Sequence, residues 1–265
     1  MKIDRQRVKD AFAEYTSNYD NSDGKIKLKI DHTYRVAAIC EEIAHSLNLN
    51  KNDTDIAWLT GMLHDVGRFE QLKNYGTFSD ADSIDHAKYG VQILFDMDKI
   101  ADYVDIEQIN ANDCGKGELE MVRTAIWNHS AYRVEEGIDD KTKMFCDILR
   151  DADKIDIFKV NYDVPFEVIY NVTNEQLVND EVTKEVMEAF CEHHAVLRSL
   201  KKTSVDHIVG HIALAYELVY PESYKIMKRQ GYINRLLEFQ SDNPKTRGQF
   251  EIINREMEDY IEKCL

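Results

Sequence analysis

Apolar residues spaced three or four positions apart run through most of this chain, and this spacing is what most limits the fold that it can adopt. The first clear series follows residue 32 and comprises Val36, Ile39, Ile43 and Leu47. Interruptions are few, because the 265 residues include only 3 prolines and 11 glycines. No convincing set of alternating strands is present. The sequence therefore predicts an all-α fold.

The predicted helices follow one another without internal repeats or a low-complexity tract. Hydrophobic residues make up 43% of the chain, which is enough to bury a sizeable core. We therefore expect a single all-α domain over residues 1–265. Within it we expect a helical core over about residues 25–165 and a C-terminal helical extension over about residues 166–265.

The stretch GMLHDVGRFE, residues 61–70, places an imidazole and a carboxylate between apolar residues. Its helical pattern ends near Gly67, and the polar residues that follow predict a long loop over residues 68–84. Loops of this length often act as lids over a site. The aromatic rings of Tyr75 and Phe78 either stack on a base or pin this loop to the core.

Net charge and cysteine content limit the partners that this protein can bind and the cellular compartment in which we expect it. The formal net charge is −16, from 33 Lys and Arg against 49 Asp and Glu, and no basic stripe opposes it. Such a surface repels nucleic-acid polymers, whereas a local pocket can still bind a small phosphorylated molecule. No signal peptide is visible, and no stretch approaches a membrane span. Five scattered cysteines without a CxxC pair are typical of a reduced, cytoplasmic protein.

Six histidines and aspartates stand on or beside the apolar stripes of the predicted core helices. Each alone would more often be an ordinary core or capping residue, but together they suit a metal site inside a helical bundle. Imidazole and carboxylate ligands favour Fe, Mn, Zn, Ni or Co, and Mg less readily. The six predicted ligands are His32, His64, Asp65, His86, His129 and Asp153.

The neighbours His64 and Asp65 favour a paired site. Adjacent side chains on a helix differ by about 100° in direction, but a carboxylate can bridge two ions through its two oxygens. One ion would take His32, His64, Asp65 and Asp153, and the other would take His86, His129 and the second oxygen of Asp65. Both ions would keep open positions for water, and water between two cations is deprotonated near neutral pH to a hydroxide nucleophile.

The order of these residues resembles the successive motifs of the HD-domain superfamily of metal-dependent phosphohydrolases, which have an all-α core. The resemblance covers roughly residues 30–160, about half of the chain. The motifs are HTYRVA (32–37), LHDVGRF (63–69), DHAKYG (85–90), NHS (128–130) and DADKID (151–156). In having both His86 and His129, the chain resembles the branch of this superfamily that binds two metals.

The resemblance implies an enzyme that uses a metal-bound hydroxide to hydrolyse a phosphoester or phosphoanhydride. The implied substrate is a nucleotide or another small phosphorylated metabolite, and the implied cofactor is one or two divalent ions. Two alternatives stay open. Some superfamily members with a similar ligand set are di-iron oxygenases, and the centre could also belong to a non-enzymatic sensor. Neither a nucleic-acid polymer nor a membrane is an expected partner.

Departures from the superfamily pattern concern the basic residues. Arg68 stands where some relatives place a Glu and others a Lys, so the resemblance leaves the general acid unassigned. Asp65 and Arg68 are the expected catalytic residues, and Arg68 and Lys154 are the expected substrate-binding residues. Arg68 either holds a phosphate through its forked guanidinium or pairs with a loop acid such as Asp80. Lys154 either reaches a phosphate or pairs with Asp151.

Two further groups lie beyond the motifs. His207 and His211 are one helical turn apart and could chelate a metal, but no third ligand is near in the sequence, so ordinary helix positions are expected. Arg198, Lys201 and Lys202 form the one basic cluster of an acidic chain. This cluster either meets a phosphate or forms a solvated helix end.

Overall fold

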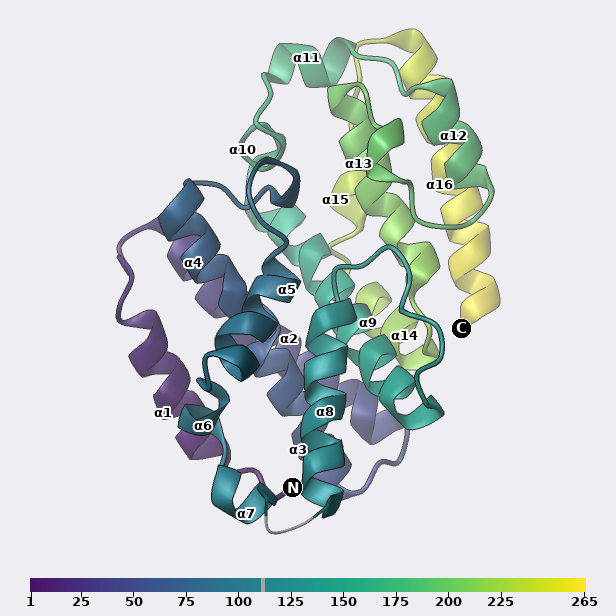
Figure 1. Ribbon diagram of the computed structural model, residues 1–265. Helices are drawn as coiled ribbons and strands as arrows, with labels where there is room; N and C mark the ends of the chain where they lie inside the picture. Colours follow the sequence, from purple (N-terminus) through teal and green to yellow (C-terminus); the bar gives the residue numbers. More distant parts are fainter. Residues whose placement is uncertain (111–112) are drawn as a thin grey trace. The chain divides into compact units, whose positions relative to one another are not determined.

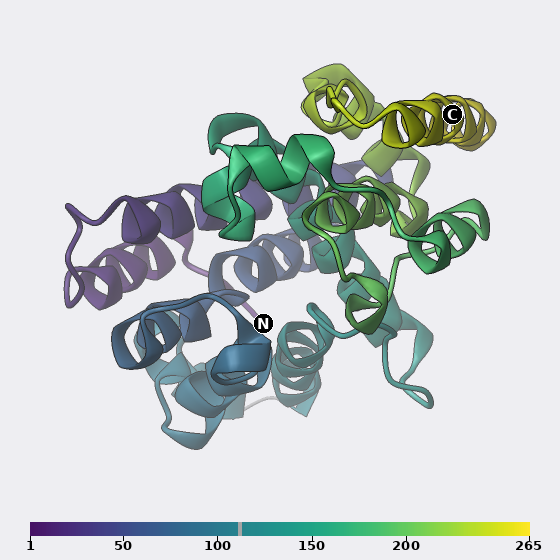
Figure 2. The ribbon, with the colours of Figure 1, turned by 90° about the horizontal axis from the view of Figure 1, so that it is seen from above.

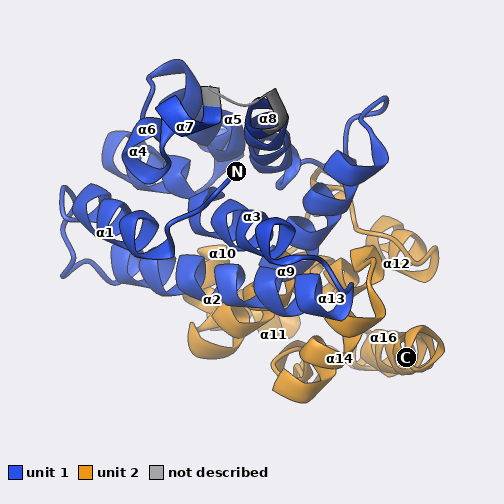
Figure 3. Ribbon diagram, turned by 90° about the horizontal axis from the view of Figure 1, so that it is seen from below, with its two compact units in different colours: residues 1–153 blue, residues 154–265 orange. Residues whose placement is uncertain are grey.

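The computed structural model describes residues 1–110 and 113–265, and the side chains of residues 110–114, Cys114 among them, lie outside the description. Within the described residues, helices are the only regular elements, which confirms the all-α prediction. The chain divides into two compact units, residues 1–153 and residues 154–265 (Figure 3). None of the described helices is both long enough and apolar enough to cross a membrane.

The first unit is a helical bundle (Figure 1). It contains all six predicted ligand residues, whereas the last three residues of the motif DADKID belong to the second unit. Its elements are α1 (Arg5–Thr16), α2 (Gly24–Ser46), α3 (Lys51–Leu63), α4 (Val66–Tyr75), η1 (Asp80–Asp82), α5 (His86–Val91), η2 (Gln92–Asp96), α6 (Ile100–Tyr103), α7 (Ile106–Asn110), α8 (Asp113–Asn128) and the first part of α9 (Asp140–Asp163). The long helices α2 and α3 pack closely. At their contact, a Cβ on Gly61 would stand only 2.6 Å from Ala37 Cα, so the two backbones can approach this closely only with glycine there. Helix α1 lies beside the first half of α2 (Figure 2). The rings of Phe12 and Tyr34 meet edge to face at 5.6 Å.

Helix boundaries near the motifs differ from the sequence prediction. Helix α2 begins well before His32, so this residue lies in the middle of a helix. Helix α4 extends to Tyr75, so the prediction of a loop over residues 68–84 is wrong for the first half of this stretch. The reason is that Phe69 and Leu72 are buried on one face of α4, so this stretch is an amphipathic helix despite its polar composition. The helix pattern does not end at Gly67, which lies inside α4.

The second unit is built around α13, whose apolar face is fully buried through Ile208, Val209 and Ile212. This helix packs against α11, α12 and α15. Besides the end of α9, the elements are α10 (Phe166–Tyr170), α11 (Asn174–Asn179), α12 (Lys184–Cys191), η3 (Arg198–Leu200), α13 (Ser204–Ile212), η4 (Ala213–Glu217), α14 (Pro221–Gln230), α15 (Asn234–Leu237) and α16 (Pro244–Cys264).

His211 on α13 makes the second unit sensitive to acid. Its Nδ1 lies 2.8 Å from the Tyr170 hydroxyl and 3.1 Å from Asn161 Oδ1. Burial, reinforced by the positive charges of Lys201 and His207, lowers the pKa of His211 from 6.5 to about 3. The unfolded chain therefore binds more protons than the folded protein below pH 6.5. Stability is fully present above that pH and falls as the pH falls.

Replacing His211 with Gln should remove this part of the pH dependence. Between pH 7 and pH 5, the free energy of unfolding of the wild type should fall by about 2 kcal/mol more than that of His211→Gln. Urea denaturation at the two pH values measures the difference. The exposed His45 on α2, replaced in the same way, is the control. Equal pH dependence in the wild type and in His211→Gln would contradict the prediction.

Candidate metal centre

The six predicted ligand residues lie together in the first unit. All of them except Asp153 are at most 4% exposed. Helices that are far apart in the sequence thus deliver polar side chains to one interior position, where unpaired polar groups are costly. The residues come from α2 (His32), the junction of α3 and α4 (His64 and Asp65), the start of α5 (His86), the position after α8 (His129) and α9 (Asp153).

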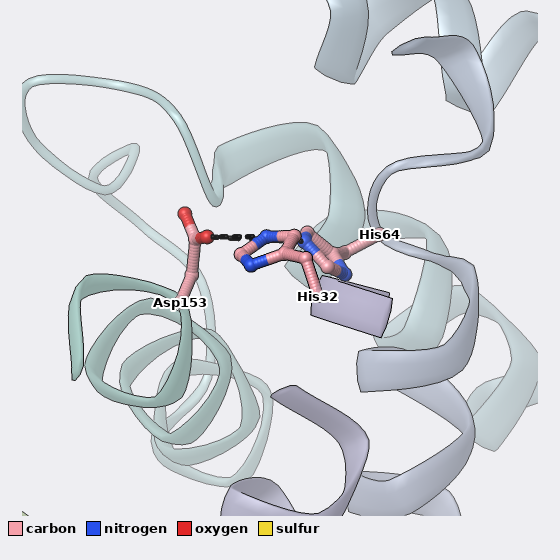
Figure 4. A group of neighbouring side chains, drawn as sticks. All are labelled: His32, His64 and Asp153. Atoms are coloured by element: carbon pink, nitrogen blue, oxygen red, sulfur yellow. Dashed lines mark hydrogen bonds and ion pairs between the residues drawn. The ribbon is translucent and has the colours of Figure 1, made fainter. Parts of the chain in front are cut away.

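A first group joins His32, His64 and Asp153 (Figure 4). His32 Nε2 lies 3.2 Å from Asp153 Oδ1 and 3.2 Å from His64 Nε2. One oxygen of Asp65, Oδ2, lies 3.4 Å from His32 Nε2 and 3.5 Å from His64 Nε2. Ligand atoms about 2.1 Å from a tetrahedral ion are themselves roughly 3.4 Å apart. The donor atoms of this group therefore have the spacing that one ion requires.

A second group joins His86 and His129 beside the other oxygen of Asp65. Their Nε2 atoms are 2.9 Å apart. Asp65 Oδ1 lies 3.4 Å from His86 Nε2 and 3.8 Å from His129 Nε2. The two oxygens of a single carboxylate thus face two different sets of imidazoles.

The hydrogen bonds of the rings decide which nitrogens carry protons. The Nδ1–H of His64 donates to Gly61 O at 2.8 Å, and the Nδ1–H of His129 donates to Ile126 O at 2.7 Å. The Nδ1–H of His86 donates to a carboxylate. In neutral rings, Nε2 then carries a lone pair directed at the cluster. Facing lone pairs repel each other unless a cation shares them, so this donor set fits a metal ion.

Residues 30–159 match the family model described as HD domain, and the span contains all six residues of the cluster. This part of the chain is an HD domain. The assignment confirms the superfamily that the motif order predicts. Proteins of this family are mostly metal-dependent phosphohydrolases. Comparisons with curated proteins and with solved structures find no match.

The HD dipeptide itself lies at a break between two helices. Helix α3 ends just before His64, and Asp65 has non-helical dihedral angles of φ −104° and ψ 14°. This break solves the directional problem that two consecutive residues would have inside a regular helix. His64 and Asp65 can both face the cluster because the chain changes direction between them and α4.

Gly67 allows the HD-domain helix α5 to reach the cluster. A Cβ on Gly67 would overlap the carbonyl oxygen of His86 and would stand 2.7 Å from Gly90 N. Helices α4 and α5 can therefore cross at this distance only with glycine at this position. Asp85 caps α5 by accepting from the backbone N–H groups of Ala87 and Lys88 at 3.1 and 3.2 Å. The close crossing and the cap together place His86 beside Asp65.

Electrostatics keep the carboxylates charged and the second pair of imidazoles neutral. Burial alone would raise the pKa of Asp65, but the Lys29 ammonium and the imidazoles of His64 and His86 hold it well below its usual range. Burial lowers the pKa of His129 to about 3 and also lowers that of His86. Charged carboxylates and neutral imidazoles are the forms that bind metal ions.

Lys29 is not marked by any motif, yet its ammonium lies 2.6 Å from Asp65 Oδ2. It is also 5.5 Å from the centre of the Phe78 ring. Lys29 precedes His32 by three residues, so the helix period already places the two side chains on one face of α2. This spacing is the signal that could have identified Lys29 from the sequence.

Asp80 contacts both His86 and Arg68. Its Oδ2 accepts from His86 Nδ1 at 2.7 Å, while its Oδ1 accepts from Arg68 Nη1 at 2.7 Å and from Gln71 Nε2 at 2.8 Å. Arg68 Nη1 also donates to Phe78 O at 2.5 Å. Of the two alternatives for Arg68, the structure contains the ion pair with Asp80. No sequence pattern links Asp80 to His86, because the contact depends on how residues 76–85 fold back.

Lys154 follows Asp153 on α9 and is only 7% exposed. It is therefore not a solvated surface lysine. Its predicted contact with a substrate phosphate stays a prediction, as does metal binding by each of the six cluster residues.

Proposed function

We propose that this protein is a metal-dependent phosphohydrolase with two divalent ions. The proposed reaction is hydrolysis of a phosphoester or phosphoanhydride in a nucleotide or another small phosphorylated metabolite. The observation that carries the proposal is the geometry of Asp65, whose Oδ2 faces His32 and His64 while its Oδ1 faces His86 and His129. One carboxylate between two sets of imidazoles is suited to bridge a pair of ions.

In the proposed centre, the ligands divide as the contacts do. His32, His64, Asp153 and Asp65 Oδ2 would hold one ion, and His86, His129 and Asp65 Oδ1 would hold the other. Divalent ions bound there would lower the pKa of coordinated water and withdraw negative charge from a phosphoryl group. Because the second set has fewer protein ligands, substrate oxygens have more room to bind on that side.

The remaining charged residues would orient the ligands and the substrate. Lys29 provides the closest cation to Asp65 Oδ2 among the ion pairs of the described residues. Once an ion engages Asp65 Oδ2, the ammonium of Lys29 would be available for a phosphate oxygen. Asp80 holds the His86 ring through Nδ1, and Arg68 and Gln71 in turn hold Asp80. The catalytic role proposed for Arg68 is therefore to fix Asp80 and to add positive charge beside Asp65.

Metal analysis followed by a substrate screen tests the proposal. Protein loaded with Mn, Fe(II), Zn, Ni or Co is offered nucleoside phosphates, sugar phosphates and phosphodiesters, and product release is measured. We expect metal-dependent turnover of at least one substrate, which His64→Ala abolishes. Failure of every metal form on every substrate would overturn the proposal. Oxygen consumption with a mixed-valent di-iron resonance signal would instead favour an oxygenase.

Asp80→Asn should weaken the second ion selectively. The asparagine can still accept from His86 Nδ1, but it loses the negative charge that fixes the ring. Loss of such an outer partner weakens metal binding by about 10- to 100-fold. We expect this loss for one of the two ions when metal is titrated into metal-free protein. Asp82→Asn is the matched control, because Asp82 is an exposed residue of the same turn. Equal binding of both ions in Asp80→Asn would contradict the role of Asp80.

A further inference from the structure

The second unit contains a group of lysine, arginine and histidine residues that the HD domain does not explain. We define it by four residues, which are Arg198, Lys201, His207 and His211. Arg198 begins η3 and Lys201 follows its last residue, while the two histidines lie one turn apart on α13. All four belong to the second unit, residues 154–265.

The side chain of Lys201 lies across α13 at Gly210. A Cβ on Gly210 would overlap both Cε and Nζ of Lys201, so the ammonium lies directly on the helix backbone. The side chain is half-buried there. Burial, together with the charge of Arg198, lowers the pKa of Lys201 to about 8. The protein thus encloses a positive charge in a place where water solvates it poorly.

The Lys201 ammonium forms no direct ion pair with a carboxylate among the described residues. Among the described residues, Lys201 Nζ makes neither a hydrogen bond nor an ion pair. Asp206 is the carboxylate that acts on it, but the oxygens of Asp206 already accept from the backbone N–H groups of Thr183, Lys202 and Thr203 at 2.9 to 3.0 Å. A half-buried cation without a direct ion pair is poorly stabilised, and a ligand of opposite charge would stabilise it.

His207 adds a second donor beside Lys201. Its ring stacks on Tyr170, with 5.6 Å between ring centres and 22° between planes. Its nitrogens make no hydrogen bond within the described part of the chain. The charges of Lys201 and Arg198 help to lower the pKa of His207, although burial is the larger cause. The same charges would repel a metal ion, so the i, i+4 pair of histidines suits an anion better than a cation.

We propose that Lys201 and His207 bind a small anion of the phosphate class in the second unit. The ligand is either free phosphate or the phosphoryl group of an organic molecule, and both would accept from the Lys201 ammonium and the His207 ring. Both residues belong to the second unit, whereas the metal cluster belongs to the first, and the proposal does not depend on the proposed hydrolase activity.

Proton NMR of the histidine rings in zinc-loaded protein tests the site. The protein is titrated with inorganic phosphate while the Cε1–H signal of His207 is followed. A second titration uses methylphosphonate, and chloride at equal ionic strength is the blank. His207→Gln assigns that signal. We expect a saturable shift with phosphate. A shift with methylphosphonate as well would identify an organic phosphoryl group as an acceptable ligand, whereas its absence would restrict the site to the free anion.

Two substitutions, each with a matched control, make the result decisive. Lys201→Met should weaken phosphate binding at least about tenfold, as expected for loss of a charged hydrogen bond. The neighbouring Lys202→Met is the matched control, since Lys202 is exposed and pairs with Glu185 at 3.7 Å. Gly210→Ala keeps the charge but displaces Lys201, and should weaken binding similarly, whereas Gly248→Ala has open space and should not. No shift of His207 with either anion, or wild-type binding in both Lys201→Met and Gly210→Ala, would overturn the proposal.

Discussion

Asp65→Asn should lose at least one of two bound metal ions and reduce turnover by about 100-fold or more. The asparagine keeps one carbonyl oxygen but cannot bridge two cations, because its other terminal atom is an NH₂ donor. Removing a ligand shared by both ions should cost more than removing an outer partner, which by itself weakens binding by about 10- to 100-fold. Elemental analysis and steady-state kinetics measure the two effects.

Asp147→Asn is the control for this substitution. It makes the same change of charge in the same unit, at a residue that pairs with Lys143 on its own helix. Its activity and metal content should equal those of the wild type. If Asp65→Asn retained two ions and full turnover, a bridging role for Asp65 would be excluded.

Gly67→Ala should lower the free energy of unfolding by about 3 kcal/mol, which is a fall in Tm of roughly 6 to 10 °C. The added Cβ would overlap the carbonyl oxygen of His86 and approach Gly90 N, and neither backbone group can move without separating α4 from α5. This cost exceeds the gain of about 1 kcal/mol that alanine normally brings within a helix. Thermal unfolding monitored by circular dichroism measures the change.

Gly117→Ala provides the comparison for Gly67→Ala. Gly117 is also inside a helix of the first unit, but a Cβ there meets nothing within 4 Å. This variant should be as stable as the wild type or more stable by up to about 1 kcal/mol. The added Cβ in Gly67→Ala also displaces His86, so the affinity of this variant for the second ion should fall. Gly117→Ala should bind both ions normally. Equal stability of the two variants would show that α4 and α5 can separate at no cost.

The sequence predicts the helical class and the identity of the clustered residues well, because both depend on local patterns. Helical periodicity and the scarcity of breakers are visible without a structure. The histidines and aspartates stand out because such residues rarely lie on apolar stripes. The predicted loop over 68–84 failed for a related reason. The polar residues of α4 conceal the two buried positions Phe69 and Leu72, and only packing decides that they belong to a helix.

The sequence alone determined an all-α chain of the HD-domain superfamily, with six polar side chains that need a common partner. The tertiary structure decided which oxygen of Asp65 faces which imidazoles. It also decided that Arg68 pairs with Asp80 and that Lys29 pairs with Asp65. The physical reason is that composition and periodicity act over a few residues along one helix. The direction of a side chain at a helix break, and the fold of a loop onto its neighbour, depend instead on how separate helices pack.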